Sequence, residues 1–210
     1  MMYFFDIKNI AFSVLGYPFS YVELIATLSG LLSVYYASRA NILTWPTGII
    51  NELFCFILFF QVQLYADMVL QIYFFIVTIY GWYYWKTNTV EKKVATVTSR
   101  NRFLLAGVIV VGTITFGFLF QNIYLLLPSI FAGPAAYPFT DSFIMMLSVI
   151  ATILLAKKKM ENWVLWITAD IFAVVLYFKK EIYFLSLEYL VFGGLASYGL
   201  YHWNKQLKNG

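Results

Sequence analysis

The stretch Tyr80-Gly81-Trp82-Tyr83-Tyr84-Trp85 decides how the sequence is organised, because its pattern returns as Tyr198-Gly199-Leu200-Tyr201-His202-Trp203. The two copies are 118 residues apart (198 minus 80), and the same shift aligns residues 23–85 with residues 141–203 without a gap. Tryptophan, glycine and acidic residues recur at matched positions, which composition alone does not easily produce. The sequence therefore predicts an internal repeat.

The composition predicts that this repeat lies in a membrane. Of the 210 residues, 62% are apolar and only 11% are charged, and the mean hydropathy is +0.77. A soluble domain usually has about 25% charged residues, so this chain has too few charges to cover a surface that faces water. The 14 cationic residues lie in short segments between apolar runs, which excludes a basic nucleic-acid-binding domain.

Seven apolar runs are each close to the length that a bilayer requires of a transmembrane helix. They lie near residues 20–38, 46–64, 68–85, 103–124, 141–156, 163–179 and 183–203. The segment from Tyr3 to Leu15 mixes charged and aromatic residues and is too short to cross a bilayer. We therefore expect an interfacial amphipathic helix there.

Each repeat contains three predicted spans, and the fourth span has no counterpart. The expected fold is an all-α polytopic membrane protein with seven transmembrane helices in a 3+1+3 arrangement, in which the extra span keeps the two repeats parallel. We expect an N-terminal interfacial segment (1–18), a first repeat (19–86), a cytoplasmic loop with linker helix (87–127), an external proline-rich loop (128–140), a second repeat (141–204) and a cytoplasmic tail (205–210). Such repeats usually place a substrate site at their interface, near the middle of the membrane.

The cationic residues predict the orientation of the chain. Counted over alternate loops, eleven of them fall on one side of the membrane, and three, Lys8, Lys179 and Lys180, fall on the other. By the positive-inside rule, the side with eleven cations is the cytoplasm. We therefore expect the N-terminus outside and the C-terminus in the cytoplasm.

Polar and aromatic side chains inside the predicted spans are the candidate binding residues, because polar groups in a bilayer usually face a cavity or the bundle interior. We expect the site to contain Trp45, Asn51, Glu52, Gln71, Tyr73, Trp163, Trp166, Asp170 and Glu188. Gly48 occupies the position of Trp166 in the other repeat, which predicts a slot for a flat ring. Alternatively, groups such as Asn51 hold helices together by hydrogen bonds. Trp85 and Trp203, at span ends, are expected in an interfacial aromatic belt.

No lysine or arginine lies in the middle of any predicted span. A phosphate-bearing solute would favour cationic side chains, whereas aromatic rings and carboxylates suit a cation. The pattern favours a neutral-polar or cationic solute that contains a ring. The sequence has no HExxH, GxSxG or Walker A motif, so we expect neither an enzyme nor a metal site or cofactor.

Five motifs follow one another along the chain. They are Trp45-Pro46-x-Gly48-x-x-Asn51, Leu64-Tyr65-Ala66-Asp67, Leu70-Gln71-x-Tyr73, Tyr80-Gly81-Trp82-Tyr83-x-Trp85 and Trp163-x-x-Trp166-x-x-x-Asp170. From about Tyr21 to Trp203, the ordered set resembles the PnuC family of bacterial vitamin transporters, specifically the nicotinamide riboside transporters.

The resemblance implies a fold similar to that of SWEET sugar transporters, a homotrimer in the bacterial inner membrane, and facilitated diffusion of nicotinamide riboside, an NAD precursor. It also implies that Trp166 and Asp170 line the site, and that a separate cytoplasmic riboside kinase traps the solute. On physical grounds we place the indole of Trp166 against the pyridinium ring, a contact worth about 0.5–2 kcal/mol.

Three alternatives remain at this stage. A carrier for another vitamin or a sugar would share the fold. A proton-coupled carrier would use Glu52, Asp170 and Glu188 as a relay. A seven-helix receptor is disfavoured by the parallel repeat and by the absence of a soluble output domain from the sequence.

Overall fold

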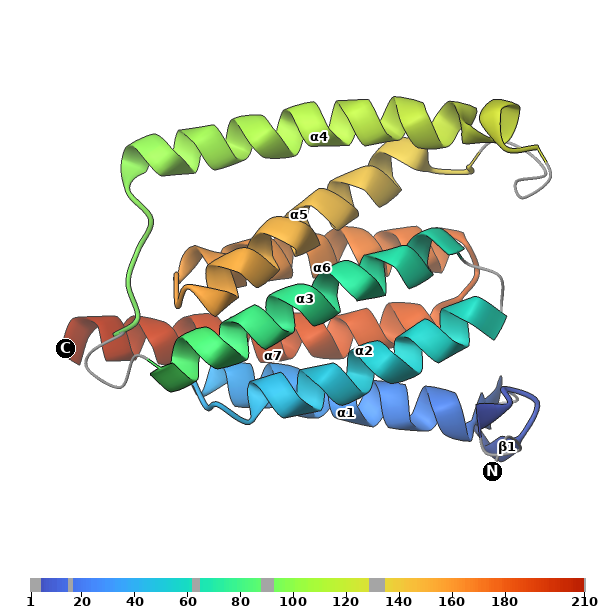
Figure 1. The fold of residues 1–210 in the computed structure, drawn as a ribbon, viewed down its shortest axis with the longest axis horizontal. Coiled ribbons are helices and arrows are strands. Elements are labelled where there is room, and N and C mark those ends of the chain that lie inside the picture. Colours follow the sequence, from blue (N-terminus) through green and yellow to red (C-terminus); the bar gives the residue numbers. More distant parts are fainter. Residues whose placement is uncertain (1–4, 15–16, 62–64, 88–92, 129–134, 210) are drawn as a thin grey trace.

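The computed structural model describes residues 5–14, 17–61, 65–87, 93–128 and 135–209, and this part of the chain contains seven helices (Figure 1). The helices are α1 (Tyr21–Ser38), α2 (Thr44–Gln61), α3 (Tyr65–Thr87), α4 (Ser99–Leu126), α5 (Pro138–Ala156), α6 (Glu161–Lys179) and α7 (Tyr183–Asn209). Successive helices run in opposite directions, so the two termini lie at opposite ends of the bundle (Figure 1). The seven long helices predicted from the apolar runs are confirmed.

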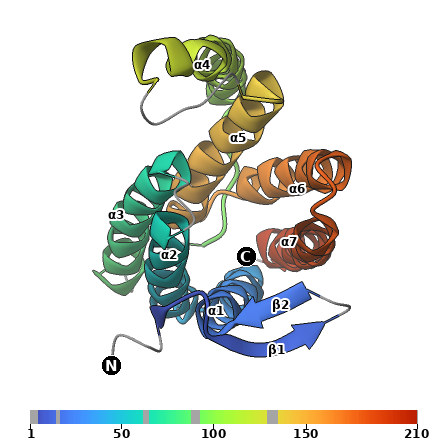
Figure 2. The same cartoon turned by 90° about the vertical axis from the view of Figure 1, so that its right-hand side faces the viewer.

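Six of these helices form a closed ring. Going round it, α1 packs against α2, α2 against α3, α3 against α5, α5 against α6, α6 against α7, and α7 against α1. Helix α4 lies outside the ring, against α5 (Figure 2). Contacts within the first unit, α1–α3, correspond to contacts within the second unit, α5–α7. The two units meet at two seams, the α1–α7 seam and the α3–α5 seam.

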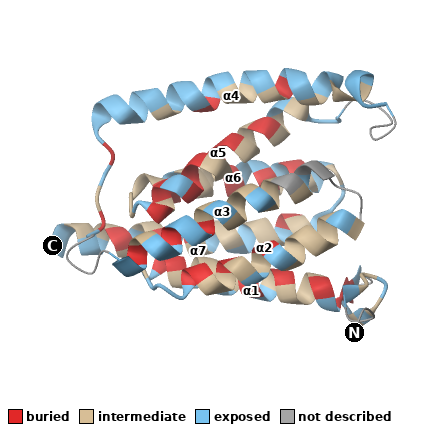
Figure 3. Cartoon of the chain, in the orientation of Figure 1, coloured by how far each residue is buried: buried red, intermediate tan, exposed pale blue. Residues whose placement is uncertain are grey.

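Three of the described helices, α4, α5 and α6, are long and apolar enough to span a membrane by length and hydropathy. The other four have 18 to 27 residues, but tyrosine, tryptophan and other polar residues lower their hydropathy. Helix α4 is the most exposed of the three, because Ile109 and Gly117 are its buried residues (Figure 3). The polar and aromatic residues therefore gather in the ring rather than on α4.

The N-terminal segment forms a β-hairpin, so the predicted interfacial helix is wrong. Strand β1 (Ile10–Val14) pairs antiparallel with strand β2 (Tyr17–Ser20). Phe12 lies opposite Phe19 in the register, and their rings stack with centroids 5.5 Å apart. A short segment of mixed residues fits a helical or an extended period, and a cross-strand aromatic pair favours the extended form.

The N-terminal segment contacts helices of both units. The side-chain amide of Gln61, at the end of α2, donates to the carbonyl oxygen of Phe5 (2.6 Å) and accepts from the backbone N–H of Ile7 (3.1 Å). The ring of Tyr17 stacks on Phe184 of α7 at 5.5 Å. Because the hairpin also contacts α1, it lies across the α1–α7 seam at this end of the bundle (Figure 2).

Candidate functional site

Four tryptophans form one core at the end of the bundle where α1, α3 and α5 finish. The rings of Trp45 and Trp85 meet edge to face at 5.1 Å, those of Trp163 and Trp203 do so at 5.5 Å, and Trp85 lies 6.5 Å from Trp203. Trp203 is fully buried and Trp85 is 9% exposed. The predicted interfacial belt is therefore wrong for these two residues, which join the units through a shared tryptophan core.

The two remaining core tryptophans lie against glycines of their own units. A Cβ atom on Gly81 would lie 2.3 Å from the ring of Trp45, and one on Gly199 would lie 2.7 Å from the ring of Trp163. This close approach explains why the Tyr-Gly pattern recurs. Trp45 and Trp163 are buried, whereas Trp166 is half-buried beside the core. Of the three tryptophans in the predicted site, Trp166 therefore keeps the most accessible ring.

Two carboxylates at matched positions are buried inside the two units. Glu52 of α2 is 7% exposed, and its Oε1 accepts a hydrogen bond from Thr78 of α3, while Oε2 has no partner among the described residues. Asp170 of α6 is 4% exposed and lies beside Gly193 of α7. The ion pairs between described residues lie elsewhere. Because an unpaired buried carboxylate is costly, both groups are suited to bind an entering cation or a proton.

Asn51 and Gly48 contribute to packing within the first unit. The side-chain amide of Asn51 donates to the carbonyl oxygen of Ala26 on α1 at 2.8 Å, as expected of a group that holds helices together. A Cβ atom on Gly48 would lie 3.3 Å from Ser33 Oγ and 3.5 Å from Thr78 Cγ2. The predicted slot for a flat ring is therefore not open at Gly48.

The remaining predicted site residues lie on α3 and α7. The hydroxyl of Tyr73 donates to a backbone carbonyl of α5 at 2.8 Å, across the α3–α5 seam. Gln71 is half-buried on α3, as is Glu188 on α7. Tyr73 therefore contributes to the contact between the two units.

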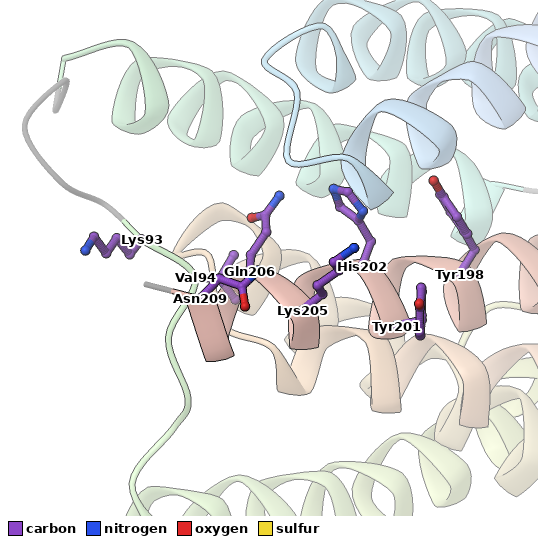
Figure 4. Close-up of a pocket in the computed structure, with 8 residues that line it drawn as sticks. All are labelled: Lys93, Val94, Tyr198, Tyr201, His202, Lys205, Gln206 and Asn209. Carbon is purple, nitrogen blue, oxygen red and sulfur yellow. The ribbon is translucent and has the colours of Figure 1, made fainter.

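A cavity of about 480 Å³ lies at the C-terminal end of α7, away from these residues. It is lined by Lys93, Val94, Tyr198, Tyr201, His202, Lys205, Gln206 and Asn209 (Figure 4). The labelled side chains point in different directions and do not converge on one point (Figure 4). In the described part of the chain, no three His, Cys, Asp or Glu residues are grouped to hold a metal ion. The buried polar residues inside the two units therefore remain the candidate site.

Residues 20–205 match the nicotinamide mononucleotide transporter family. The chain belongs to this family. The nicotinamide riboside transporter PnuC of Escherichia coli is 33% identical over 96% of this chain and 94% of its own length. The riboflavin/roseoflavin transporter RibM of Streptomyces davaonensis is 26% identical over 86% of this chain and 83% of its own length. The resemblance carried by the five motifs is confirmed.

A solved relative has the same fold as this family member. The crystal structure of the vitamin B3 transporter PnuC matches 90% of this chain and 83% of its own, with a TM-score of 0.69 and 23% identity. The chain is therefore a multi-pass membrane transporter of the nicotinamide mononucleotide transporter family, and not an enzyme.

One residue of this transporter's candidate site was missed in the sequence. Gly193 lies against Asp170, because a Cβ atom there would be 3.5 Å from the Asp170 Cβ. The available signal was the pair Gly193-Gly194 inside an apolar run, since a glycine within a helix often permits close approach of a neighbouring group. Its position relative to Asp170 depends on the packing of α6 on α7, which the pattern of one segment does not contain.

Proposed function

We propose that this chain carries nicotinamide riboside by facilitated diffusion. The 33% identity to the riboside transporter of Escherichia coli, over nearly the full length of both chains, supports this substrate. Nicotinamide riboside combines a flat pyridinium cation with a carboxamide and a ribose. Its uptake supplies a precursor of NAD, and a separate cytoplasmic kinase traps it by phosphorylation.

The observation that carries the proposal is the burial of Asp170 and Glu52 without a cationic partner among the described residues. A pyridinium ring provides the missing positive charge. Trp166, the most accessible of the three predicted site tryptophans, stacks on that ring with about 0.5–2 kcal/mol of cation–π attraction. Gln71 and Glu188 bind the carboxamide and the ribose hydroxyls.

The other predicted residues complete or support this site. The amide of Asn51 bonds helix α1 through its nitrogen and binds the solute through its oxygen. Tyr73 stabilises the α3–α5 seam by its hydrogen bond to α5. Trp45 and Trp163 hold the frame against which Trp166 is positioned.

The charges also favour the riboside over the mononucleotide for which the family is named. The mononucleotide carries a phosphate, which would lie near carboxylates with no described lysine or arginine paired to them. Like charges brought together disfavour the wrong ligand. The phosphorylated product therefore stays in the cell.

In the membrane, we propose that all seven helices span the bilayer in a 3+1+3 arrangement with two parallel repeats, residues 19–86 and 141–204. The N-terminus lies outside and the C-terminus lies in the cytoplasm, as the positive-inside rule requires. Three copies assemble in the bacterial inner membrane.

Uptake of labelled nicotinamide riboside into proteoliposomes tests the proposal. With no ion gradient, the label equilibrates across the membrane, and unlabelled riboside competes with it. Uptake that requires a proton or sodium gradient would indicate a coupled carrier instead. Failure of the riboside to enter under either condition would remove it as the substrate.

Riboflavin is the second candidate, because the riboflavin/roseoflavin transporter RibM aligns with 86% of this chain. Riboflavin is a neutral ring system, so it gains less from a buried carboxylate. Calorimetric titration with riboside, mononucleotide, riboflavin and thiamine ranks the four ligands. Tighter binding of riboflavin than of the riboside would make riboflavin the proposed substrate.

A further inference from the structure

Two hydrogen bonds of the tryptophan core cross between the units. The indole Nε1–H of Trp85, on α3, donates to the carbonyl oxygen of Ala156 at the end of α5 (3.0 Å). The indole Nε1–H of Trp203, on α7, donates to the carbonyl oxygen of Ala37 near the end of α1 (3.0 Å). The donors occupy matched positions, and the acceptors are one residue apart in the repeat register. Each seam is therefore closed at this end by one indole hydrogen bond.

The other two core tryptophans make no such bond. Trp45 and Trp163 are also buried and matched, but their Nε1 atoms have no hydrogen-bond partner among the described residues. They pack against Gly81 and Gly199 of their own units. The four tryptophans thus divide by role, since one pair fills the interior of each unit and the other pair joins the units.

The core blocks the path between the units at this end of the ring. Besides the four tryptophans, it contains the buried residues Ala37, Val94, Ala156 and Ala196. A solute that moves between the units toward this end meets closely packed side chains. Passage therefore requires at least one seam to part, and the parting seam must break its indole hydrogen bond.

We propose that Trp85 and Trp203 form the closure of the cytoplasmic end, and that both of their hydrogen bonds break together when this end opens. The two rings contact each other, so a shift of one seam displaces the tryptophan that closes the other. The acceptors lie in the last turns of α1 and α5, and the Ala37 carbonyl also accepts from the backbone N–H of Ala40 (2.8 Å). The inference rests on the proposed function for its direction, from the membrane interior to the cytoplasm.

A cysteine placed in the core reports whether the closure is open. The background variant Cys55→Ala removes the single native cysteine, and Ala196→Cys introduces a thiol at a core position that is 1% exposed. A water-soluble thiol reagent is added to the purified transporter, and the rate of labelling is measured. The measurement needs no solute, so its outcome does not depend on which vitamin the transporter carries.

The test compares variants that lose the same ring volume. Trp85→Phe and Trp203→Phe each raise the labelling rate by about 3- to 10-fold more than Trp45→Phe or Trp163→Phe does. All four variants open the same volume in the core, but only the first two lose a hydrogen bond between described residues. The double variant Trp85→Phe/Trp203→Phe raises the rate further. Equal increases in both pairs, or no increase in the double variant, would overturn the proposal.

An isosteric replacement keeps the test decisive if a phenylalanine variant does not fold. Benzothienylalanine at position 85 or 203 replaces the indole N–H by sulfur and keeps the shape of the ring. The same 3- to 10-fold increase is expected, and an unchanged rate in a well-folded protein would overturn the proposal. If the labelling rates differ as expected but neither the parent protein nor the variants take up riboside, the proposed substrate is refuted and the closure is not.

Discussion

The two three-helix units share a frame, the packing of one tryptophan on one glycine, but their interior side chains differ. In each, a tryptophan at the start of the middle helix packs on a glycine of the third helix, Trp45 on Gly81 and Trp163 on Gly199. Inside the frame the units diverge: Thr78 donates to Glu52 in the first unit, but the position that matches Thr78 is an alanine in the second.

This difference separates two kinds of constraint on a repeated fold. The packing of an indole on a glycine leaves no room for variation, so both units retain it. An interior position is free to diverge, because a solute such as a riboside has two unlike halves and needs two unlike surfaces. Matched positions that have diverged are therefore the better guide to the site.

The largest expected effect concerns the shared frame. Gly81→Leu and Gly199→Leu drive a side chain into the ring of Trp45 or Trp163, and each is expected to destabilise the protein by at least about 3 kcal/mol, at the upper end of overpacking effects. Thermal unfolding in detergent measures this. Gly194→Leu is the matched control, because no atom lies within 4 Å of a Cβ atom built there. Similar losses in all three variants would contradict the comparison.

The next prediction concerns the divergent interior. Under the proposed function, Asp170→Asn is expected to weaken riboside binding by about 10-fold or more, about 1.4 kcal/mol, because it removes the negative charge that we propose neutralises the pyridinium ring. Glu52→Gln is expected to have a smaller effect, because Thr78 already bonds its Oε1. Calorimetric titration of both variants with riboside measures the two losses of affinity. A larger loss from Glu52→Gln would place the cation in the first unit.

A third prediction uses a contact that only the second unit makes. The carboxylate of Glu161 accepts from the backbone N–H of Val97 (2.9 Å) and pairs with Arg102 at 2.7 Å, whereas the matched residue of the first unit is Leu43. Glu161→Gln is expected to cost about 1 kcal/mol of stability, since Arg102 is half exposed and the pair is screened. Thermal unfolding at low and high salt checks this. An unchanged salt dependence in the variant would contradict an ionic contribution.

The smallest expected effects lie at the opposite end of the units. Glu23 accepts from the Tyr17 hydroxyl (2.8 Å), whereas the matched Asp141 pairs with Lys180 (3.1 Å). Burial, and then the bond to Glu23, raise the pKa of Tyr17 to about 12. Because the folded pKa lies above the usual value of about 10, this contribution is complete below pH 10 and is lost as pH rises toward 12.

The stability contributions of these two matched contacts therefore respond to different conditions, the Lys180–Asp141 pair to salt and the Tyr17–Glu23 bond to alkaline pH. High salt weakens the Lys180–Asp141 pair by a fraction of its roughly 0.2–1 kcal/mol, and Lys180→Gln removes that sensitivity. Tyr17→Phe removes the part of the alkaline destabilisation that comes from this phenol. Thermal unfolding of each variant and the parent, measured against pH and against salt concentration, tests both effects. A Tyr17→Phe protein that loses stability with alkali exactly as the parent does would contradict the assignment.

Much of the helical fold was predictable, because each apolar run had the length of one helix. The ends were less predictable: α7 continues to Asn209, beyond the predicted end at residue 203, and α4 begins at Ser99 rather than at residue 103. Hydropathy marks where apolar residues stop, whereas backbone hydrogen bonds continue a helix through polar residues. The hairpin was missed for a related reason, since its strands are too short for a periodicity to emerge.

The candidate site was predictable in its chemistry but not in its geometry. The burial of Glu52 and Asp170 follows from their positions in apolar runs. The burial of Trp85 and Trp203 does not, because a tryptophan at a helix end faces lipid headgroups or a neighbouring helix depending on how that helix is rotated. Only the contact between units fixes that rotation, and no single segment encodes it.

Helix α4 has a consequence for the response to lipid. With 28 residues, it is about 42 Å long at about 1.5 Å per residue, whereas a hydrocarbon core is about 30 Å thick. Its excess length must be accommodated by tilting or by projection into the headgroups, to a degree set by bilayer thickness. Because α4 rests mainly on α5, a change in acyl-chain length reaches the ring of six helices through α5.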